Sequence, residues 1–433
     1  MRRYSFVIFI CILITAIFLI YYQEVQFKEE ESVLIQAEYK IDSIDKKPNY
    51  TMFYSSNIAI IEYDYSLSEE RKIEPGTIVS VQGNLFNLNA YEQRSYANYL
   101  KSRDYDYLLK SSEIVLVKQG INLKTIIYRI RENIGRRVDF IYRADSPFVK
   151  ALVYGDKSEI EENDTDMFSK TGISHLLAIS GFHIGLLASI VLILLKNFPS
   201  SIKYFLVLIF IFVYVVITGA RPSAIRAGIF YLIYIISIFY CRRYDIISSA
   251  FLLSSLLIIL NPYILYDAGF TLSFMAVISI GMFYKSISSL LKKIKFLPSY
   301  LLSLMSLTIA AQILTLPLTY FYFQRISFIS ILSNLVSVPL VTMIYPFMLF
   351  SLVIYKIPIL GSIMINIVKL LKFILYYFNQ KISEFSMAYI DFDASNIYTT
   401  IVAYVLIFIF YTIFTIYTLK ENKNELQGFT QKY

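Results

Sequence analysis

Charged residues, histidine and cysteine are all scarce in this chain of 433 residues. Charged side chains make up 17% and hydrophobic ones 57%, whereas a typical soluble domain carries about 25% charged residues. The two histidines, His175 and His183, are too few for a His-rich zinc hydrolase. The two cysteines, Cys11 and Cys241, fit no metal spacing and support no disulfide. With only 14 Gly and 11 Pro, the composition excludes disordered and collagen-like chains and predicts an integral membrane protein.

Residues 4–22 form an uncharged apolar run that follows Arg2 and Arg3. At 1.5 Å per residue this run is long enough to cross a bilayer. A cleaved signal peptide is the alternative, but no small-x-small cleavage site is present and Tyr21-Tyr22 is typical of an interfacial anchor. We therefore expect residues 1–22 to form a retained transmembrane helix.

Residues 23–120 are polar, and short alternating stretches within them predict strands. We expect a small extracellular β-barrel there, of which the five-stranded oligonucleotide-binding (OB) type is one form. A helix is expected over 94–110. The predicted strands and turns are 32–39, 57–63, 77–83 and 113–118, with turns at Pro75-Gly76 and Gly83-Asn84.

Residues 121–172 are expected to form a basic amphipathic helix, over 122–143, and a connector. Residues 94–143 hold 11 basic and 5 acidic residues, whereas 23–93 hold 6 and 13. A helix beside a bilayer often carries arginine only to meet lipid headgroups, so lipid and nucleic-acid phosphates both remain possible partners. The candidate phosphate contacts are Arg129, Arg131, Arg136 and Arg137.

From residue 173 to 420 the chain is almost continuously apolar, and nine spans are expected there, ten with the first helix. Pro339 and Pro346 predict a discontinuous or re-entrant helix within 327–355. The expected fold class is a polytopic α-helical membrane protein of about ten spans, some discontinuous, with a small extracellular OB-like β-barrel. The nine spans are expected near 174–195, 203–219, 223–240, 245–260, 263–284, 299–323, 327–355, 358–378 and 397–419.

The loop charges orient these spans. With Arg2 and Arg3 inside, alternation places the basic loops in the cytoplasm and the acidic loop around Asp391 outside, as the positive-inside rule requires. We therefore expect both termini in the cytoplasm, including a tail over 421–433, and residues 23–172 on the extracytoplasmic side.

Polar groups inside spans are costly and mark candidate functional sites. The densest set lies in GISHLLAISGFHIG over 172–185, which contains both histidines and Ser180. On a helix, Ser180 and His183 would share a face. Gly181 and Gly185 have the spacing that lets backbones approach closely. A packing helix with satisfied histidines is the alternative.

A second set lies in TGARPSAIR over 218–226, where Ser223 is expected to cap a helix and Arg226 to face the bundle. Asp267 opens an apolar span, so it would pair with Arg226 or meet outer headgroups. The expected path through the membrane is lined by His175, Ser180, Gly181, His183, Gly185, Arg221, Ser223, Arg226, Asp267, Ser273, Gln312 and Asn334.

The block SHLLAISGFHIG at 174–185 resembles the signature of the ComEC family of competence proteins. Further matching blocks extend the resemblance over roughly residues 30–420. It implies a bacterial inner-membrane channel that passes single-stranded DNA into the cytoplasm during natural transformation. The other blocks are TGARPSAIRAG at 218–228, NPYILYDAGFTLSF at 261–274, AAQILTLPL at 310–318 and SNLVSVPLV at 333–341, with weaker matches at 96–105 and 151–160.

The resemblance also implies partners. Many members add a metallo-β-lactamase-like nuclease domain that this sequence lacks, so a separate nuclease is expected to degrade the non-entering strand. The chain has no G-x-x-x-x-G-K-[ST] motif, so an ATP-driven translocase or the membrane potential is expected to supply energy. A DNA receptor is also expected, and no cofactor, metal or enzymatic activity.

Two other functions remain open on the residues alone. An intramembrane hydrolase would use Ser180 as nucleophile and His183 as base, although such a pair on one helix rarely aligns and no third member is visible. A proton-coupled transporter of another solute would use His175, His183 and Asp267 as a relay. For the channel, we expect His183→Ala to abolish DNA uptake at nearly unchanged stability, and Gly181→Leu to damage packing.

The topology predicts which loops an impermeant thiol reagent reaches. A cysteine at Asn87 should be labelled from outside intact cells, and one at Ser289 should be labelled only after permeabilisation. The reverse pattern would contradict the proposed orientation.

Overall fold

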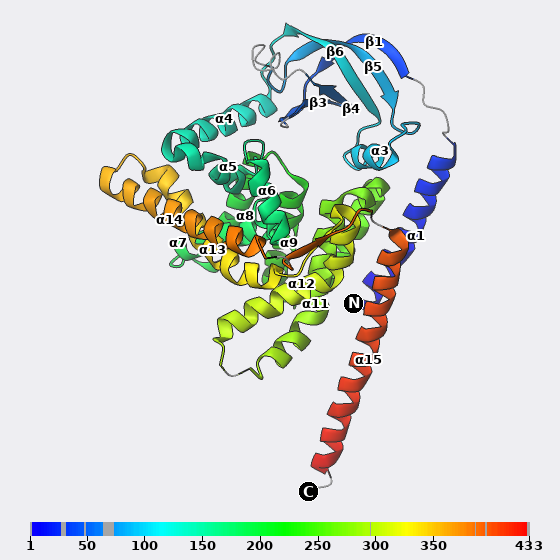
Figure 1. Cartoon of the computed structure of the whole chain (residues 1–433), viewed down its shortest axis with the longest axis vertical. Coiled ribbons are helices and arrows are strands. Elements are labelled where there is room, and N and C mark those ends of the chain that lie inside the picture. The colour runs from blue at the N-terminus through cyan, green and yellow to red at the C-terminus, as the bar shows by residue number, and fades with distance from the viewer. Residues whose placement is uncertain are drawn as a thin grey trace.

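The computed structural model describes residues 2–26, 32–46, 49–63, 73–294, 296–385, 387–394 and 396–430. A sheet stands at one end of the molecule, helix α4 (Leu123–Tyr142) runs beneath it, and a body of helices follows (Figure 1). The last helix, α15 (Ile397–Thr430), extends away from that body. Residues 431–433 of the expected tail lie outside the described residues.

The sheet has six described strands in the hydrogen-bonded order β1-β5-β6-β4-β3-β2. Only β4 and β6 are parallel; the other neighbours are antiparallel. Since β1 pairs with β5 and β2 with β3, the ladder has two ends, and the expected closed β-barrel is absent from the described chain. The strands are β1 (Ser32–Lys40), β2 (Ser43–Lys46), β3 (Thr51–Ser55), β4 (Ile58–Glu62), β5 (Ile78–Asn87) and β6 (Tyr107–Lys118).

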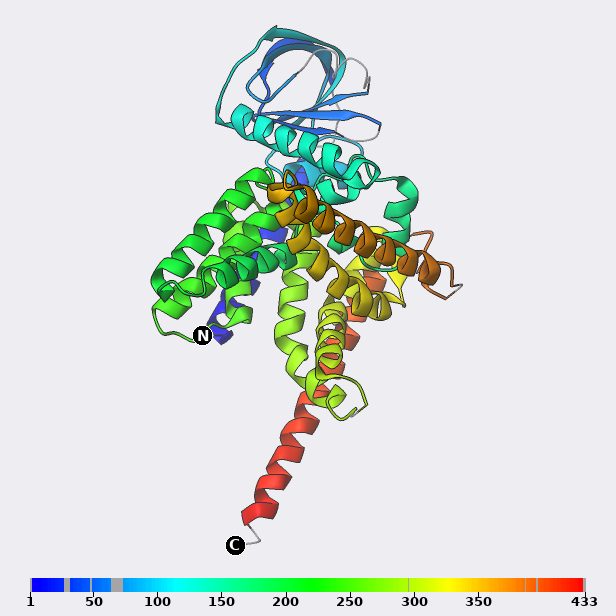
Figure 2. The same ribbon diagram turned by 90° about the vertical axis from the view of Figure 1, so that its left-hand side faces the viewer.

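The two ends of this ladder are close together because only Ile41 and Asp42 separate β1 from β2. Ile41 N donates to Thr77 O at 2.8 Å beside β5, and Asp42 N donates to Tyr54 O at 2.7 Å in β3. The sheet therefore curls strongly around its apolar core, as Figure 2 shows.

The four predicted strands correspond to β1, β4, β5 and β6, but β2 and β3 were missed. Strand β3 is buried on nearly all positions, so it lacks the alternation that marks a half-exposed strand. The predicted turn at Gly83-Asn84 is wrong, because both residues lie in β5. A Cβ on Gly83 would collide with Lys110 O at a register shift between β5 and β6, so this glycine permits a bulge. The helix expected over 94–110 is shorter, α3 (Arg94–Lys101).

The helical body contains seven helices in the described chain that are long and apolar enough to cross a membrane. Three shorter apolar helices, α7 (Gly181–Leu194), α10 (Ile246–Leu260) and the start of α15, lie where the other expected spans fall. The chain is a multi-pass membrane protein. The seven long helices are α1 (Arg2–Gln26), α8 (Ser200–Ile217), α9 (Pro222–Phe239), α11 (Ala268–Leu291), α12 (Ser299–Phe323), α13 (Ser330–Ile354) and α14 (Pro358–Ser383).

The expectation of a broken helix within 327–355 is wrong, because α13 is continuous through Pro339 and Pro346. Prolines are tolerated in membrane helices where neighbouring helices cover the freed backbone groups. Here Ile344 and Tyr345, which lie between the two half-buried prolines of α13, are fully buried. Packing therefore outweighs the local disruption.

Shorter elements connect the sheet to this body. Helices α5 (Ser146–Tyr154) and α6 (Glu162–Lys170) share one apolar core with the end of α4, with α7 and with α13 and α14. The boundaries expected at residues 120 and 172 remain predictions, and this core crosses the second of them. The remaining elements are the 3-10 turns η1 (Arg143–Asp145), η2 (Ser174–Leu176) and η3 (Pro262–Tyr266), and the short strands β7 (Arg325–Ser327) and β8 (Tyr389–Asp391).

The sheet domain also contacts the body through α3 and η3. The amide of Asn261 donates to Lys101 O at 2.8 Å and to Asp104 Oδ1 at 2.7 Å. The ammonium of Lys101 lies 4.6 Å from the ring centre of Tyr263. Two separate contacts, at α3 and at α4, thus hold the sheet over one end of the helices.

A charged network fastens the two-stranded sheet of β7 and β8 to α6. Arg325 donates from Nη1 to Asp166 at 2.7 Å and forms a bidentate pair with Asp391, with Nη2 at 3.0 Å from Oδ2. Hydrogen bonds from Arg325 lower the pKa of Asp391 below its ordinary value, although burial opposes the shift. The carboxylate therefore stabilises the folded state in its ionised form.

Replacing Arg325 by Lys should lower stability by about 1 kcal/mol, because an ammonium cannot form the bidentate pair. This stabilisation is complete above about pH 4, the usual pKa of an unfolded-chain Asp, and is lost as the pH falls through the lowered pKa. The melting temperature should thus differ between wild type and variant at pH 7, and the difference should be smaller at pH 3. Lys381→Ala, which breaks only the exposed pair with Glu384, should change nothing at either pH.

Candidate functional site

The motif over 172–185 is not one helix in the structure, so the expectation that a single helix carries His175, Ser180 and His183 is wrong. Helix α7 begins at Gly181, and Ser180 precedes it in an extended conformation with φ −137° and ψ 176°. His175 lies in the turn η2 instead. Serine is a favoured residue before a helix, but here its hydroxyl caps no backbone N–H.

The Ser180 hydroxyl faces His183, with Oγ 3.3 Å from Nδ1. His183 is fully buried, and its ring packs edge-on against Phe182 and Tyr345, with centroids 5.6 and 5.5 Å away. Its Nε2 has no hydrogen-bond partner among the described residues. A hydrolase would need an acid or carbonyl there to orient the imidazole, so the geometry does not favour a Ser-His nucleophile.

His175 is exposed, unlike His183. None of the interactions described for Asp267 reaches either histidine: its Oδ1 accepts from Phe270 N at 3.0 Å and caps α11. A proton relay through these three groups therefore lacks a connection in the described chain.

The small residues of α7 face open space. A Cβ on Gly181 would meet nothing nearer than Ala227 Cβ at 3.9 Å, and one on Gly185 would meet no atom within 4 Å. Ser189, one turn further, is exposed. Gly181 thus lies at the edge of ordinary contact with α9, whereas no described atom lies near Gly185. The expected close approach of a helix or of the strand at these glycines stays a prediction, and the described chain leaves the face of α7 around Gly185 unfilled.

Helix α9 starts beside this face. Arg221 precedes it and Pro222 occupies its first position, so Ser223 is not the capping residue. Its hydroxyl donates to Ile179 O at 2.6 Å, which ties the start of α9 to the segment before α7.

Arg226 is buried one turn into α9, with 4% of its surface exposed. Its Nη2 donates to Gly269 O at 2.9 Å, and Nε has no partner in the described chain. Asp267 lies close by, since both side chains approach Gly269, but no ion pair within 4 Å joins it to Arg226 in the described chain.

The remaining expected path residues lie deeper among the helices. Gln312 donates to Ser330 Oγ at 2.7 Å, and Ser273 is half-buried on α11. Asn334 is buried on α13 with its Oδ1 unpartnered in the described chain. One further buried polar residue lies outside the predicted set: Asn379 is fully buried, and its Nδ2 donates to Ser337 Oγ at 2.9 Å. The signal for it was an amide side chain near the C-terminal end of the apolar run 358–383.

The four arginines of α4 point to different places. Arg129 pairs with Glu74 at 2.8 Å, Arg136 donates to Asn133, and Arg137 lies over Tyr355 of the helical body. Arg131 lies 4.9 Å from the ring centre of Tyr154. They therefore form no single basic face.

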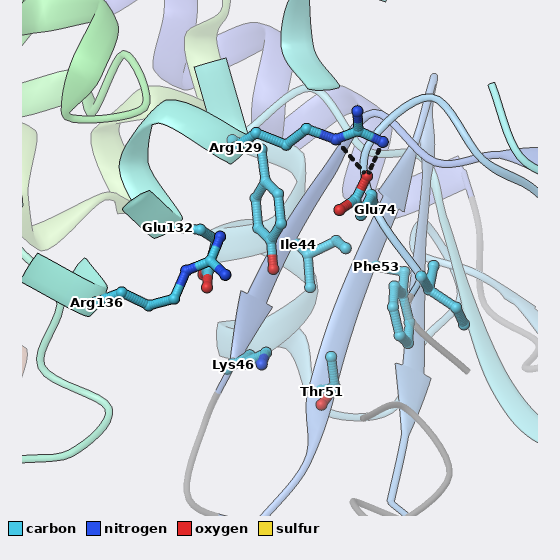
Figure 3. A pocket seen from close by; sticks show the side chains of 10 residues that line it. Ile44, Lys46, Thr51, Phe53, Glu74, Arg129, Glu132 and Arg136 are labelled. Carbon is cyan, nitrogen blue, oxygen red and sulfur yellow. Dashed lines mark hydrogen bonds and ion pairs between the residues drawn. The ribbon is translucent and has the colours of Figure 1, made fainter. Parts of the chain in front are cut away.

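Arg129 and Arg136 line a pocket of about 390 Å³ between α4 and strands β2 and β3. Figure 3 shows Arg129 held by Glu74 at one side and Arg136 at another, with Lys46 and Thr51 below. Acidic Glu74 and Glu132 balance part of the basic charge, so the pocket is not a strong site for a polyanion.

The space around Gly181 and Gly228 predicts how a leucine at each position changes the melting temperature. Gly181→Leu should leave the melting temperature unchanged or slightly raised, since leucine fits the open face and favours helix by up to about 1 kcal/mol over glycine. Gly228→Leu should lower it, because a Cβ there already contacts Ile211 and Val215 of α8 at 3.5 and 3.7 Å. Equal losses for the two variants would mean that the face along α7 is packed in solution.

The burial of His183 changes the stability expected for the His183→Ala variant, which the sequence predicted to be nearly that of the wild type. Removing a fully buried ring leaves a cavity, so the variant should lose about 1–3 kcal/mol. Thermal unfolding in detergent measures the loss, and the exposed His175→Ala is the control that should leave the melting temperature unchanged.

Comparison with known proteins assigns the chain to a family. The profile of the family described as "Competence protein" matches residues 152–416, which include the α7 face, the start of α9 and the buried polar groups of α13 and α14. No solved structure matches the chain.

Three curated proteins are similar. ComE operon protein 3 of Bacillus subtilis is 29% identical over 279 residues, which are 62% of this chain and 35% of that protein. Recombination protein 2 of Haemophilus influenzae is 28% identical over 222 residues, 48% of this chain and 28% of that protein. An uncharacterized protein of Aquifex aeolicus is 29% identical over 136 residues, 31% and 32% of the two chains.

The alignments thus span about a third of the length of these relatives. The family profile covers more than half of this chain and most of its membrane helices. The chain belongs to the competence protein family.

Proposed function

We propose that this chain passes single-stranded DNA across the bacterial inner membrane during natural transformation. Family membership over residues 152–416 is the observation that carries the proposal. The open face of α7 supports it, because a strand needs a continuous surface of small and polar groups that does not hold it tightly. Gly181, Gly185 and Ser189 provide such a surface.

The sheet domain is proposed to receive the strand. If β1 and β2 count as one bent strand, the order and directions of the strands match the five-stranded OB type, a partly open barrel that binds nucleic acids. The domains are then residues 1–22, the OB-like 23–120, the connector 121–172, the channel 173–420 and the tail 421–433.

In this arrangement ten helices cross the membrane, both termini are cytoplasmic and residues 23–172 are extracytoplasmic. The seven long helices and the three shorter apolar ones supply the ten spans. A DNA receptor, a separate nuclease and an ATP-driven translocase are the proposed partners. The proposed path retains His175, Ser180, Arg221, Asp267, Gln312 and Asn334, with His183 as a buried support.

The test is strand uptake by the full chain in liposomes. The lumen holds a complementary strand with a quencher, so that a fluorescent single strand is quenched only after it enters, and hybridisation traps it there. We expect uptake of single strands, little uptake of duplex, and none with protein-free liposomes. Failure of the wild-type protein to admit strands, while it admits a small solute with protons, would contradict the channel.

Gly185→Leu should slow this uptake about tenfold, the effect of a barrier raised by about 1.4 kcal/mol, with an unchanged melting temperature. The leucine fills the open face without displacing a described atom. The matched control is Leu194→Ala, at the exposed far end of the same helix, which should admit DNA at the wild-type rate. Normal uptake by Gly185→Leu would place this face against lipid.

A further inference from the structure

Three arginines from distant segments meet where the sheet domain contacts the helices. Arg131 comes from α4, Arg221 precedes α9, and Arg103 follows α3 in the sheet domain. Arg103 and Arg131 lie within electrostatic reach of Arg221, together with the carboxylates of Asp156 and Asp45. We call Arg103, Arg131 and Arg221 the junction arginines.

Two glycines make room for these side chains. A Cβ on Gly219 would stand 3.3 Å from Arg131 Nη1, and one on Gly155 would stand 3.1 Å from Arg221 Nε. Both glycines have φ near +77°, at 77° and 76°, a conformation that other residues rarely adopt. Two sharp turns therefore bring the backbone against the guanidinium groups, which fixes where they lie.

The junction arginines have more donors than the protein satisfies. A guanidinium carries five N–H donors, yet within the described chain that of Arg221 has no hydrogen-bond acceptor. Arg131 has only Asp156 Oδ2 at 3.9 Å, beyond hydrogen-bond distance, while Oδ1 of that carboxylate accepts from Ser158. Burial, and then the charge of Arg131, lower the pKa of Arg221, so the surroundings disfavour its positive charge.

The same place receives the N-termini of two helices. Helices α7 and α9 both begin there, since Ser223 at the start of α9 bonds to Ile179 just before α7. Unpaired N–H groups and the helix dipole favour an anion at such ends. The open face of α7 begins at Gly181, next to Ala227 of α9, so the junction leads directly onto it.

We propose that the junction arginines bind successive phosphodiester groups of a single strand as it passes from the sheet domain onto the open face of α7. This inference rests on the proposed function and specifies how the strand is recognised, through its backbone and not through its bases. The planar guanidinium group of arginine forms paired hydrogen bonds with the oxygens of a phosphate. A small number of such groups attracts a strand without holding it so tightly that it cannot pass.

The test measures salt-dependent binding to the full chain in nanodiscs of phosphatidylcholine. A fluorescent oligodeoxynucleotide is titrated by anisotropy between about 50 and 200 mM salt, where each lost single-strand phosphate contact reduces the slope of log K against log salt by about 0.7. Arg131→Gln and Arg221→Gln should each reduce it by that amount, and the double variant by twice as much. Arg242→Gln, at the exposed opposite end of α9, should leave it unchanged.

Two further measurements separate binding from folding and from lipid. The Gln variants should keep the wild-type melting temperature, since a crowded charge is removed, and Arg221→Lys should keep the slope while binding more weakly. An oligonucleotide with an uncharged methylphosphonate backbone should bind all proteins alike. If phosphatidylglycerol in the disc abolishes the difference between wild type and variants, the junction binds lipid headgroups and the inference is wrong.

Unchanged slopes in the folded Gln variants would also overturn the inference, while strand uptake by the wild-type protein in liposomes would leave the proposed function standing. Conversely, reduced slopes without any strand uptake by the wild type would support the phosphate site and contradict the channel.

Discussion

The hydrogen bond between Tyr142 and Ser351 ties the sheet domain to the membrane helices, and the geometry of the site depends on it. Tyr142 OH lies 2.6 Å from Ser351 Oγ, and both residues are fully buried. Lys372 Nζ donates to Asp145 Oδ1 at 2.7 Å and adds a second contact between the same two parts of the chain. Because α4 leaves the sheet directly after β6, any shift of its end would move both the sheet and Arg131.

The polar groups of the helical body divide into satisfied and unsatisfied sets. Ser223 and Gln312 donate to identified acceptors and so stabilise helix contacts. The imidazole Nε2 of His183 and the Oδ1 atoms of Asn334 and Asn379 have no partner in the described chain. Leaving buried polar atoms unpaired costs free energy, and proteins commonly accept such a cost at functional sites.

Glycine shows how one residue type serves opposite purposes. At Gly83, Gly155 and Gly219 a Cβ would meet neighbouring atoms, so the absent side chain permits contact. At Gly185 it would meet no described atom within 4 Å, and at Gly181 only Ala227 Cβ at 3.9 Å. The spacing of the last two predicts close approach of a helix or of a strand. What fills such a helix face depends on which elements fold against it, and that is decided by tertiary structure.

The sequence by itself determined the membrane class, the places of the apolar helices, the polar strand-rich region and the family blocks, because hydropathy and strand periodicity are local properties. Tertiary structure alone decided that the sheet ladder stays open, that α13 continues through two prolines and that His183 is buried while His175 is exposed. It alone also brought Arg131 to Arg221. These features arise from contacts between distant segments, whose packing energy outweighs local preference.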